Sequence, residues 1–186
     1  VEVCRRRTDC RLCGGTSLTE VLALRPTPPA NAFVLGSALN EYQPVFPLEL
    51  FFCDTCAHVQ LLDVLDADLL FKNYVYVSGT SPVFVKHFKE YAETILKSYI
   101  PNSANQLVID IGSNDGTLLK QFQGLGMNVL GIDPAQEISA KASAEGVKTL
   151  SKFFTRDLAR QIRVDHGAAT VITANNVFAH ADDLID

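Results

Sequence analysis

Short apolar runs alternate with amphipathic segments over the second half of the chain. Four runs rich in β-branched residues are too short for helices and predict buried strands. These strands are Leu107–Ile111, Val129–Ile132, Val147–Leu150 and Ala169–Thr173. The segments between them have helical spacing and cover Gly116–Gln123, Gln136–Glu145 and Thr155–Arg163. This alternation predicts an α/β fold with a Rossmann-like, doubly wound sheet, of which about four strands are present.

The first half of the chain has a more irregular pattern. Phe46–Phe52 reads as a strand, whereas the proline-rich stretch Arg25–Asn31 predicts an extended loop. A short helix is expected over Ala67–Phe71 and a longer amphipathic one over Pro82–Ile100, with Ser81 as its N-cap. The face of the long helix that we expect to be buried comprises Val83, Phe84, His87, Phe88, Tyr91, Ile95 and Leu96.

Composition limits the possible classes of protein. The 186 residues are 47% hydrophobic, which suffices for a core, and carry a net charge of −5. This charge argues against a nucleic-acid partner, and the basic run Arg5–Arg7 is expected to be a solvated terminus. Neither a membrane helix nor a signal peptide is visible. We therefore expect a soluble, cytoplasmic protein without a membrane partner.

A glycine loop follows the first predicted strand of the sheet. Gly112–Gly116 reads Gly-Ser-Asn-Asp-Gly and leads into a helix, a geometry that offers backbone N–H groups to a ligand. Asp133 ends the next strand about 20 positions later, where a carboxylate binds a ribose diol in this architecture. Together they predict a site for an adenosine-containing ligand, although a plain turn between strand and helix is the alternative.

The loop residues favour one adenosine ligand over another. The dinucleotide fingerprint has a glycine where this chain has Asn114, and Asp110 is an acid close to where a diphosphate would lie. S-adenosylmethionine has no phosphate and carries a sulfonium and an ammonium group, so acidic and amide side chains are acceptable beside it. We therefore expect S-adenosylmethionine in preference to NAD.

Further candidates for the cofactor site lie in neighbouring loops. Before the long helix, Tyr74 and Ser81 belong to a segment rich in hydroxyl groups, and Pro134 directly follows Asp133. Phe154 could lie against an adenine, but one of the rings of Phe153 and Phe154 is expected to belong to the core.

The last predicted strand is followed by a polar stretch. It contains Asn175 and His180, and it lies where substrate and cofactor are expected to meet. His180 could be a base or a substrate anchor, or an ordinary surface histidine.

The cysteines form two Cys-x-x-Cys pairs, Cys10 with Cys13 and Cys53 with Cys56. Two such knuckles supply four thiolates for a closed, tetrahedral structural zinc. Disulfides and a redox pair are alternatives, but no secretion signal is visible and neither pair opens a helix after a thioredoxin-like strand. We therefore expect zinc.

Three parts are expected along the chain. They are a zinc-binding domain over residues 1–64, a connecting helical segment and cofactor lid over 65–104, and the first half of the S-adenosylmethionine domain over 105–186.

The motifs occur together in one order along the chain. These are the two cysteine pairs, Tyr74–Gly79, Ile109–Gly116, Gly131–Ala135 and Ala174–His180. In this combination, over nearly its whole length, the chain resembles the zinc-containing, S-adenosylmethionine-dependent C-methyltransferases that act on nucleotide-linked deoxysugars in natural-product biosynthesis.

The resemblance implies methyl transfer to carbon 3 of a 4-keto deoxysugar on dTDP or a similar carrier, through an enolate. It implies that Gly112, Asn114, Asp133 and Asn175 hold the methyl donor. Tyr76 and His180 would face the sugar as candidate catalytic residues.

Members of that family continue well beyond the position of Asp186, with further strands, a Glu-His pair expected to supply the base and another domain. We therefore expect this chain to be a fragment or a shortened relative that is catalytically inactive alone. We also expect a monomer. Lys152 replaces an acid that many methyltransferases direct to the adenine, which weakens that contact. Two other functions stay open, a non-catalytic zinc-ribbon interaction module and an NAD-linked sugar-nucleotide oxidoreductase or epimerase.

Overall fold

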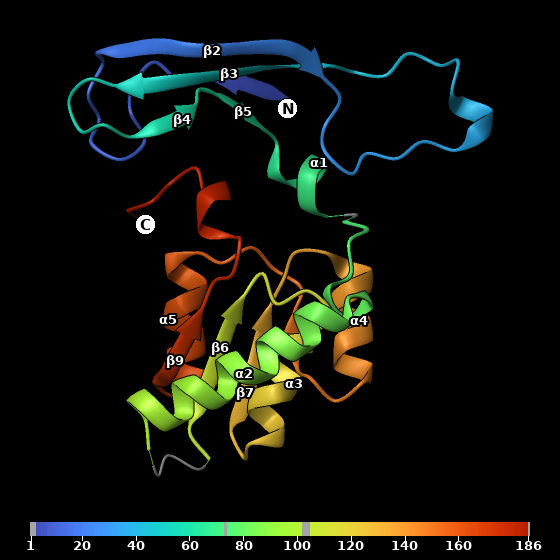
Figure 1. Cartoon of the computed structure of the whole chain (residues 1–186), viewed down its shortest axis with the longest axis vertical. Coiled ribbons are helices and arrows are strands. Elements are labelled where there is room, and N and C mark those ends of the chain that lie inside the picture. Colours follow the sequence, from blue (N-terminus) through green and yellow to red (C-terminus); the bar gives the residue numbers. More distant parts are fainter. Residues whose placement is uncertain (1–2, 73, 102–104, 186) are drawn as a thin grey trace. The chain divides into compact units, whose positions relative to one another are not determined.

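The computed structural model describes residues 3–72, 74–101 and 105–185. The chain forms two compact units (Figure 1). Unit 1 comprises Val1–Lys72 together with Ala181–Asp186, and unit 2 comprises Asn73–His180. The last residues thus belong to the same unit as the N-terminal part of the chain. The expected connecting segment, residues 65–104, is shared between the two units.

Unit 1 is built from two small antiparallel sheets. One pairs β1 with β5, and the other has the order β2-β3-β4. Its elements are β1 (Cys4–Arg6), β2 (Leu18–Thr27), η1 (Gly36–Ala38), β3 (Phe46–Cys53), β4 (Val59–Leu61), β5 (Asp63–Leu65) and α1 (Ala67–Phe71). Its buried apolar side chains are few, namely Cys10, Phe51, Cys53 and Leu62. So small a core calls for a further stabilising element such as a metal ion.

Strand β2 was not expected from the sequence. The expected loop over Arg25–Asn31 is wrong at its start, because β2 continues to Thr27 and pairs with Phe46 of β3. Pro26 lies within an irregularity of the register between Leu24 and Thr27. At such an interruption of an edge strand, the missing N–H of proline breaks no ladder hydrogen bond.

Unit 2 is a parallel four-stranded sheet with helices, as the sequence predicts. The order β8-β7-β6-β9 places the first strand at the centre and reverses there, which defines a topological switch point between β6 and β9. The strands are β6 (Leu107–Ile111), β7 (Asn128–Ile132), β8 (Thr149–Leu150) and β9 (Ala169–Thr173). The helices are η2 (Ser78–Thr80), α2 (Pro82–Tyr99), α3 (Thr117–Gly124), α4 (Gln136–Ala144), α5 (Arg156–His166) and η3 (Phe178–His180).

Two hydrophobic clusters hold the helices against the sheet. In one, Phe88 and Ala92 of α2 pack with α3 and with Val108 of β6. In the other, Leu158 and Ile162 of α5 pack with β6 and β7. Because successive side chains of β6 point to opposite faces, the two clusters cover both faces of the sheet (Figure 1). No helix among the described residues is long and apolar enough to span a membrane.

The first turn of α2 differs from the expected amphipathic face. Val83 is 78% exposed and Phe84 38% exposed, and His87 is exposed as well. The buried residues begin only with Phe88. The predicted face therefore holds for the later turns of the helix, which pack on α3, and is wrong for its start.

Candidate functional site

The four paired cysteines form a metal centre within unit 1. The sulfur atoms of Cys10, Cys13, Cys53 and Cys56 all lie within 4.8 Å of one another. The Sγ atoms of Cys10 and Cys56 are 3.7 Å apart, as are those of Cys13 and Cys53. A tetrahedral zinc site, with sulfur at about 2.3 Å from the metal, places its ligands about 3.8 Å apart. A disulfide would need about 2 Å, so the cluster fits zinc and not two disulfides.

The two knuckles repeat the same backbone turn. Gly14, with φ of +73°, donates its N–H to the carbonyl of Cys10 over 2.8 Å. Ala57, with φ of +62°, donates likewise to the carbonyl of Cys53 over 2.8 Å. Each pair of thiols is therefore carried on a hydrogen-bonded turn of its own.

Loop Gly112–Gly116 leaves the end of β6 in a left-handed conformation. Gly112 has φ of +69°, and its N–H donates to the carbonyl of Ile132 over 2.7 Å. A Cβ at Gly112 would lie 2.3 Å from Cγ2 of Val177, which is in the loop after β9. Only glycine fits this turn, and the contact brings the loops after β6 and β9 together at the switch point.

Asp133, at the tip of β7, faces this loop. Its Oδ2 accepts the backbone N–H of Asn114 over 2.8 Å, and its Oδ1 accepts that of Ala135 over 2.9 Å. Burial raises the pKa of this carboxyl group, while the two N–H donors oppose the shift. Asp133 is thus placed where the sequence predicts, and it also fixes the loop.

A second buried acid lies beneath the loop. Oγ1 of Thr173 on β9 donates to Oδ1 of Asp110 on β6 over 2.6 Å. Burial raises the pKa of Asp110 to about 7, the hydrogen bond from Thr173 lowers it, and the charge of Asp133 adds to the increase. The polar groups around the loop are therefore carboxylates, amides and hydroxyls, as an organic cation requires.

Residues 74–80, which we call the strap, are tied to the loop. Oδ1 of Asn114 accepts the N–H of Ser78, and Nδ2 of Asn114 donates to the carbonyl of Tyr76, both over 2.9 Å. Oδ2 of Asp115 accepts the N–H of Gly79 over 2.9 Å. The side chain of Asn114 therefore holds the backbone beside Tyr76.

Two buried polar atoms, one after β6 and one after β9, are left without a partner. Within the part of the chain that the structure describes, neither Oγ of Ser113 nor Nδ2 of Asn175 has a hydrogen-bond partner. Ser113 is only 4% exposed. Such atoms at the carboxyl ends of β6 and β9 are suited to a polar ligand that supplies the missing hydrogen bonds.

The other predicted site residues have varied places. His180 is exposed in η3, and its N–H donates to the carbonyl of Val177 over 2.9 Å. The rings of Tyr74 and Tyr76 meet edge to face, with centroids 6.5 Å apart. Ser81 accepts the N–H of Phe84 as the N-cap of α2, over 3.4 Å.

In the loop after β8, the expectation that one of the two phenylalanine rings belongs to the core is wrong. Phe153 and Phe154 are 36% and 40% exposed, so neither ring belongs to the core. Pro134 is half-buried beside Asp133.

Asp115 and Gly79 were not selected from the sequence. Oδ1 of Asp115 accepts both the hydroxyl and the N–H of Thr117, over 2.6 and 3.2 Å, and so fixes the turn that leads into α3. Aspartate often accepts the backbone N–H two residues further on in a turn, and this local signal could have identified it. The contact with Gly79 links segments far apart in the sequence, which no local pattern reveals.

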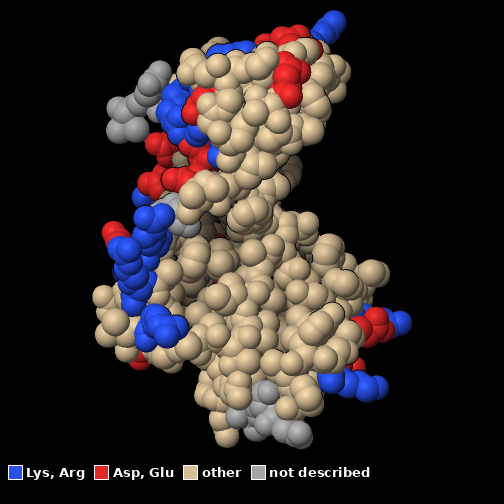
Figure 2. Space-filling model, turned by 90° about the vertical axis from the view of Figure 1, so that its left-hand side faces the viewer, with Lys and Arg blue, Asp and Glu red and all other residues tan. Residues whose placement is uncertain are grey.

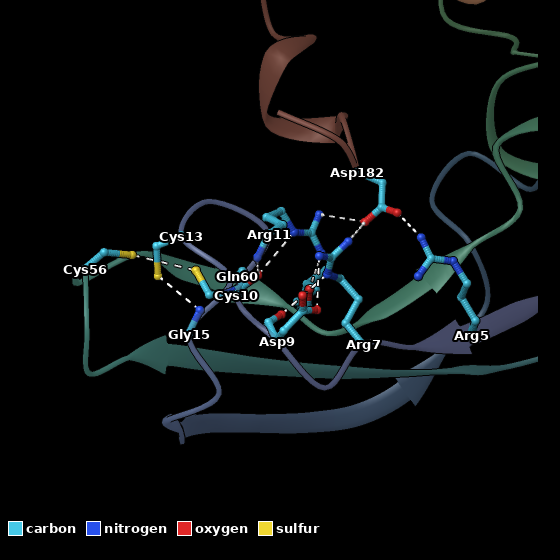
Figure 3. Close-up of polar contacts among 11 residues, drawn as sticks. Arg5, Arg7, Asp9, Cys10, Arg11, Cys13, Gly15, Cys56, Gln60 and Asp182 are labelled. Atoms are coloured by element: carbon cyan, nitrogen blue, oxygen red, sulfur yellow. Dashed lines mark hydrogen bonds and ion pairs between the residues drawn. The ribbon is translucent and has the colours of Figure 1, made fainter. Parts of the chain in front are cut away.

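The basic run at the N-terminus is not a solvated terminus, contrary to the prediction. Arg6 pairs with Glu49 over 2.9 Å and with Asp63 over 2.8 Å. Arg5 and Arg7 pair with Asp182. The pairing depends on strand β1 and on a distant segment of the chain. On the face that Figure 2 presents, acidic and basic side chains lie next to one another at several points. Figure 3 shows the pairs that Arg5 and Arg7 make with Asp182.

A parallel sheet with its acidic loop at the switch point defines unit 2 as a cofactor-binding α/β domain. Residues 84–186, more than half of the chain, match the family model described as "Methyltransferase domain". The chain belongs to this methyltransferase family. Residues 10–71 match a model described as "Putative zinc binding domain" and include all four cysteines of the metal centre.

A curated relative covers both units. The C-methyltransferase NovU of Streptomyces niveus is 28% identical over 183 residues, which make up 98% of this chain and 43% of that protein. The chain thus spans less than half the length of this relative.

Two solved structures match the chain at a lower sequence identity than this relative does. The plantazolicin methyltransferase BpumL in complex with SAH is 17% identical, with a TM-score of 0.38, over 54% of this chain and 38% of that one. The magnesium protoporphyrin IX methyltransferase ChlM from Synechocystis PCC 6803 with bound SAM is also 17% identical, with a TM-score of 0.32, over 38% of this chain and 39% of that one.

Proposed function

We propose that this chain is part of an S-adenosylmethionine-dependent C-methyltransferase that acts on a nucleotide-linked 4-keto deoxysugar. The observation that carries the proposal is the match to a C-methyltransferase along 98% of the chain, which includes both the four-cysteine centre and the switch-point loop. Methyltransferase domains alone serve many substrates, so the combination of the two units is the more specific feature.

The proposed cofactor site lies at the carboxyl ends of β6, β7 and β9. Asp133 would accept the ribose hydroxyls, because its carboxylate follows the second strand and lies beside the glycine loop. Gly112 would allow close approach of the backbone, and Nδ2 of Asn175 would donate the hydrogen bond that it lacks in the described structure. Tyr74, Ser81, Pro134 and Phe154 are proposed as outer contacts, and Ser81 would have to keep its role as a helix cap.

In the proposed reaction the substrate ketone acidifies the neighbouring C3–H bond. A base takes the C3 proton, and the electron pair of that bond moves into an enolate whose oxygen carries the charge. Tyr76 and His180 would donate hydrogen bonds to this oxygen and orient the sugar. C3 would then form a bond to the methyl group that S-adenosylmethionine supplies when bound, with the electron pair of the broken C–S bond remaining on the sulfur of S-adenosylhomocysteine. We place the base outside residues 1–186, so this chain would bind cofactor without turnover.

The test is calorimetric titration of the chain, with its zinc quantified, with S-adenosylhomocysteine. We expect binding that is lost in Asp133→Ala and retained in Asp157→Asn. Asp157 is an exposed acid of α5 and serves as the matched control. NAD should bind at least about tenfold more weakly, because a diphosphate meets carboxylates at this loop.

Equal or tighter binding of NAD would contradict the proposal and favour an oxidoreductase. Sugar methylation by the 186-residue chain alone would contradict our placement of the base. The substrate class is tested with a longer protein that contains this chain, by comparing the 4-keto sugar nucleotide with its 4-hydroxy counterpart. Methylation of both at equal rates would contradict a mechanism through the enolate.

A further inference from the structure

Asn114 uses both polar atoms of its side chain on the strap. Its Oδ1 accepts the N–H of Ser78, and its Nδ2 donates to the carbonyl of Tyr76, both over 2.9 Å. Asn114 is only 9% exposed. The side chain that the family resemblance assigns to the methyl donor is thus already bound to another segment of unit 2.

An amide is the side chain that these two contacts require. A carboxylate at position 114 would accept the N–H of Ser78 but would have no hydrogen to donate to the carbonyl of Tyr76. The backbone of Asn114 is left-handed, with φ of +51°, a conformation that asparagine adopts more readily than most residues. The residue type and the backbone conformation therefore both suit a residue that holds the strap.

The backbone of the same residue is bound to Asp133. The N–H of Asn114 donates to Oδ2 of Asp133 over 2.8 Å, so a single residue joins the candidate ribose acid to the strap. The next residue adds a second contact, because Oδ2 of Asp115 accepts the N–H of Gly79 over 2.9 Å. Two neighbouring residues of the glycine loop thus hold two neighbouring residues of the strap.

The strap continues directly into a packed helix. Ser81 follows it and caps α2 by accepting the N–H of Phe84 over 3.4 Å. Helix α2 packs with α3 through Phe88 and Ala92. The strap can therefore leave the loop only if the contacts of Asn114 and its neighbour open. All of these residues belong to unit 2.

We propose that Asn114 is a positioning residue that couples the cofactor site to the strap, so that the cofactor binds first and fixes the backbone at Tyr76 for the sugar. A ligand on Asp133 restrains the carboxylate that also holds the N–H of Asn114. The side chain of Asn114 passes this restraint to the strap. The identity of the ligand and the role of Tyr76 rest on the proposed function, whereas the contact between Asn114 and the strap does not.

The first experiment measures hydrogen exchange of the strap amides in the full 186-residue chain without a ligand. Asn114→Gly retains access to the left-handed backbone and removes the amide. We expect exchange at Ser78 to be at least about tenfold faster in this variant, because the hydrogen bond from its N–H has been lost. The amides of β6 should keep their wild-type rates.

Two controls separate this contact from other effects. Asn105 is also left-handed, with φ of +64°, and it is exposed and precedes β6, at the opposite end of that strand from the loop. Asn105→Gly should leave exchange in the strap unchanged. Tyr76→Phe should also leave it unchanged, because Asn114 binds the carbonyl of residue 76 and not its ring.

A third variant approaches the same hydrogen bond from the strap. Ser78→Pro removes the donated N–H and leaves the loop intact, and the extended backbone of Val77 is compatible with a following proline. Exchange at Gly79 should be faster in Ser78→Pro than in wild type. This variant keeps the test open if Asn114→Gly does not fold.

The coupling is tested with S-adenosylhomocysteine. At saturation it should slow exchange at Ser78 in the wild type by at least about fivefold and should slow it little in Asn114→Gly. Because coupling is reciprocal, the dissociation constant from calorimetry should rise in Asn114→Gly by about the factor of protection that the wild type gains. Asn105→Gly should bind with the wild-type dissociation constant.

The outcomes separate the proposal from the proposed function. Unchanged exchange at Ser78 in Asn114→Gly, or equal acceleration in β6, overturns the role of Asn114 in holding the strap. Equal slowing by the ligand in wild type and Asn114→Gly overturns the coupling, and a loss of affinity far above the protection factor would make Asn114 a direct ligand contact instead. If the wild type does not bind S-adenosylhomocysteine, the proposed function is contradicted, while the exchange rates without ligand still decide whether Asn114 holds the strap.

Discussion

The backbone N–H of Asn114 donates to Oδ2 of Asp133 over 2.8 Å, so the glycine loop and the tip of the second strand are locked together. Oδ1 of the same carboxylate accepts the N–H of Ala135. Asp133 therefore holds the loop closed in the structure, and under the proposed function its remaining lone pairs would accept hydrogen bonds from the ligand. Variants at this position should show both effects.

Replacing Asp133 by asparagine should destabilise unit 2 even without a ligand. The amide offers one acceptor oxygen where two N–H groups now point, so one buried donor loses its partner at a cost of about 1–3 kcal/mol. Four of the five tyrosines, at positions 74, 76, 91 and 99, lie in unit 2, and the chain has no tryptophan. Urea unfolding followed by tyrosine fluorescence thus reports on this unit. A variant as stable as Asp157→Asn would show that the lost hydrogen bond contributes nothing to stability.

Asp110 should make the stability of unit 2 depend on pH. Its folded-state pKa of about 7 lies above the usual 3.8, because burial favours the neutral acid. Between these values the folded chain binds more protons than the unfolded chain, so stability is highest near pH 4 and falls as the pH rises to about 7. The change is of the order of a few kcal/mol.

Asp110→Asn should remove this slope. Zinc loss at low pH affects wild type and variant alike, so the measured quantity is the difference in unfolding free energy between them, from pH 4.5 to pH 8. A difference that is constant over this range would mean that Asp110 is ionised throughout.

Gly79→Ala should release the strap from the loop. A Cβ at Gly79 would lie 2.5 Å from Oδ2 of Asp115 and 2.8 Å from Oγ1 of Thr117, so the hydrogen bond from Gly79 to Asp115 cannot form without a shift. We expect a loss of about 1–2 kcal/mol of stability and faster hydrogen exchange at Ser78 and Gly79. Gly124→Ala is the control in the same unit, because a Cβ there meets nothing within 4 Å. Equal exchange at Ser78 in both variants would contradict this role of Gly79.

Zinc should be necessary for unit 1 and dispensable for unit 2. Unit 1 buries few apolar side chains, whereas unit 2 has two hydrophobic clusters of its own. We expect one zinc ion per chain in the wild type and in Cys4→Ser, and none in Cys53→Ser. Loss of zinc should abolish protection of β3 amides and preserve that of β6. Loss of protection in both units would mean that they unfold together.

The sheet and the metal ligands could be predicted because their signals are local. Strand β6 and strand β9 have the expected bounds, since apolar runs between turns define them without help from the rest of the chain. The knuckle spacing likewise identifies the four cysteines. The predicted α/β fold with a four-cysteine zinc centre is confirmed, and so is membership of a methyltransferase family.

What was missed depends on partners that are distant in sequence. Arg5 and Arg7 look like a solvated run until Asp182 is seen beside them. Strand β2 is exposed along nearly its whole length and contains a proline, so neither burial nor propensity marks it. Asn114 was expected at the cofactor, but nothing local indicates that its side chain binds the strap.

The contact between Gly112 and Val177 offers a final prediction, because steric clash and backbone strain can be separated there. Gly112→Ala faces both, since φ is +69° and the new Cβ would lie 2.3 Å from Cγ2 of Val177. We expect a loss of about 2–4 kcal/mol, of which about 1–2 kcal/mol is the cost of a left-handed alanine.

Combining Val177→Ala with Gly112→Ala should recover only that part of the stability loss that comes from the steric clash. Urea unfolding of the two single variants and the double variant gives the coupling energy. The double variant should lose about 1–2 kcal/mol less unfolding free energy than the sum of the two single losses. Additive losses would mean that the loops after β6 and β9 are not in contact in solution. Complete rescue would mean that alanine adopts this backbone conformation without strain, so that the glycine is required only for the space that Val177 leaves.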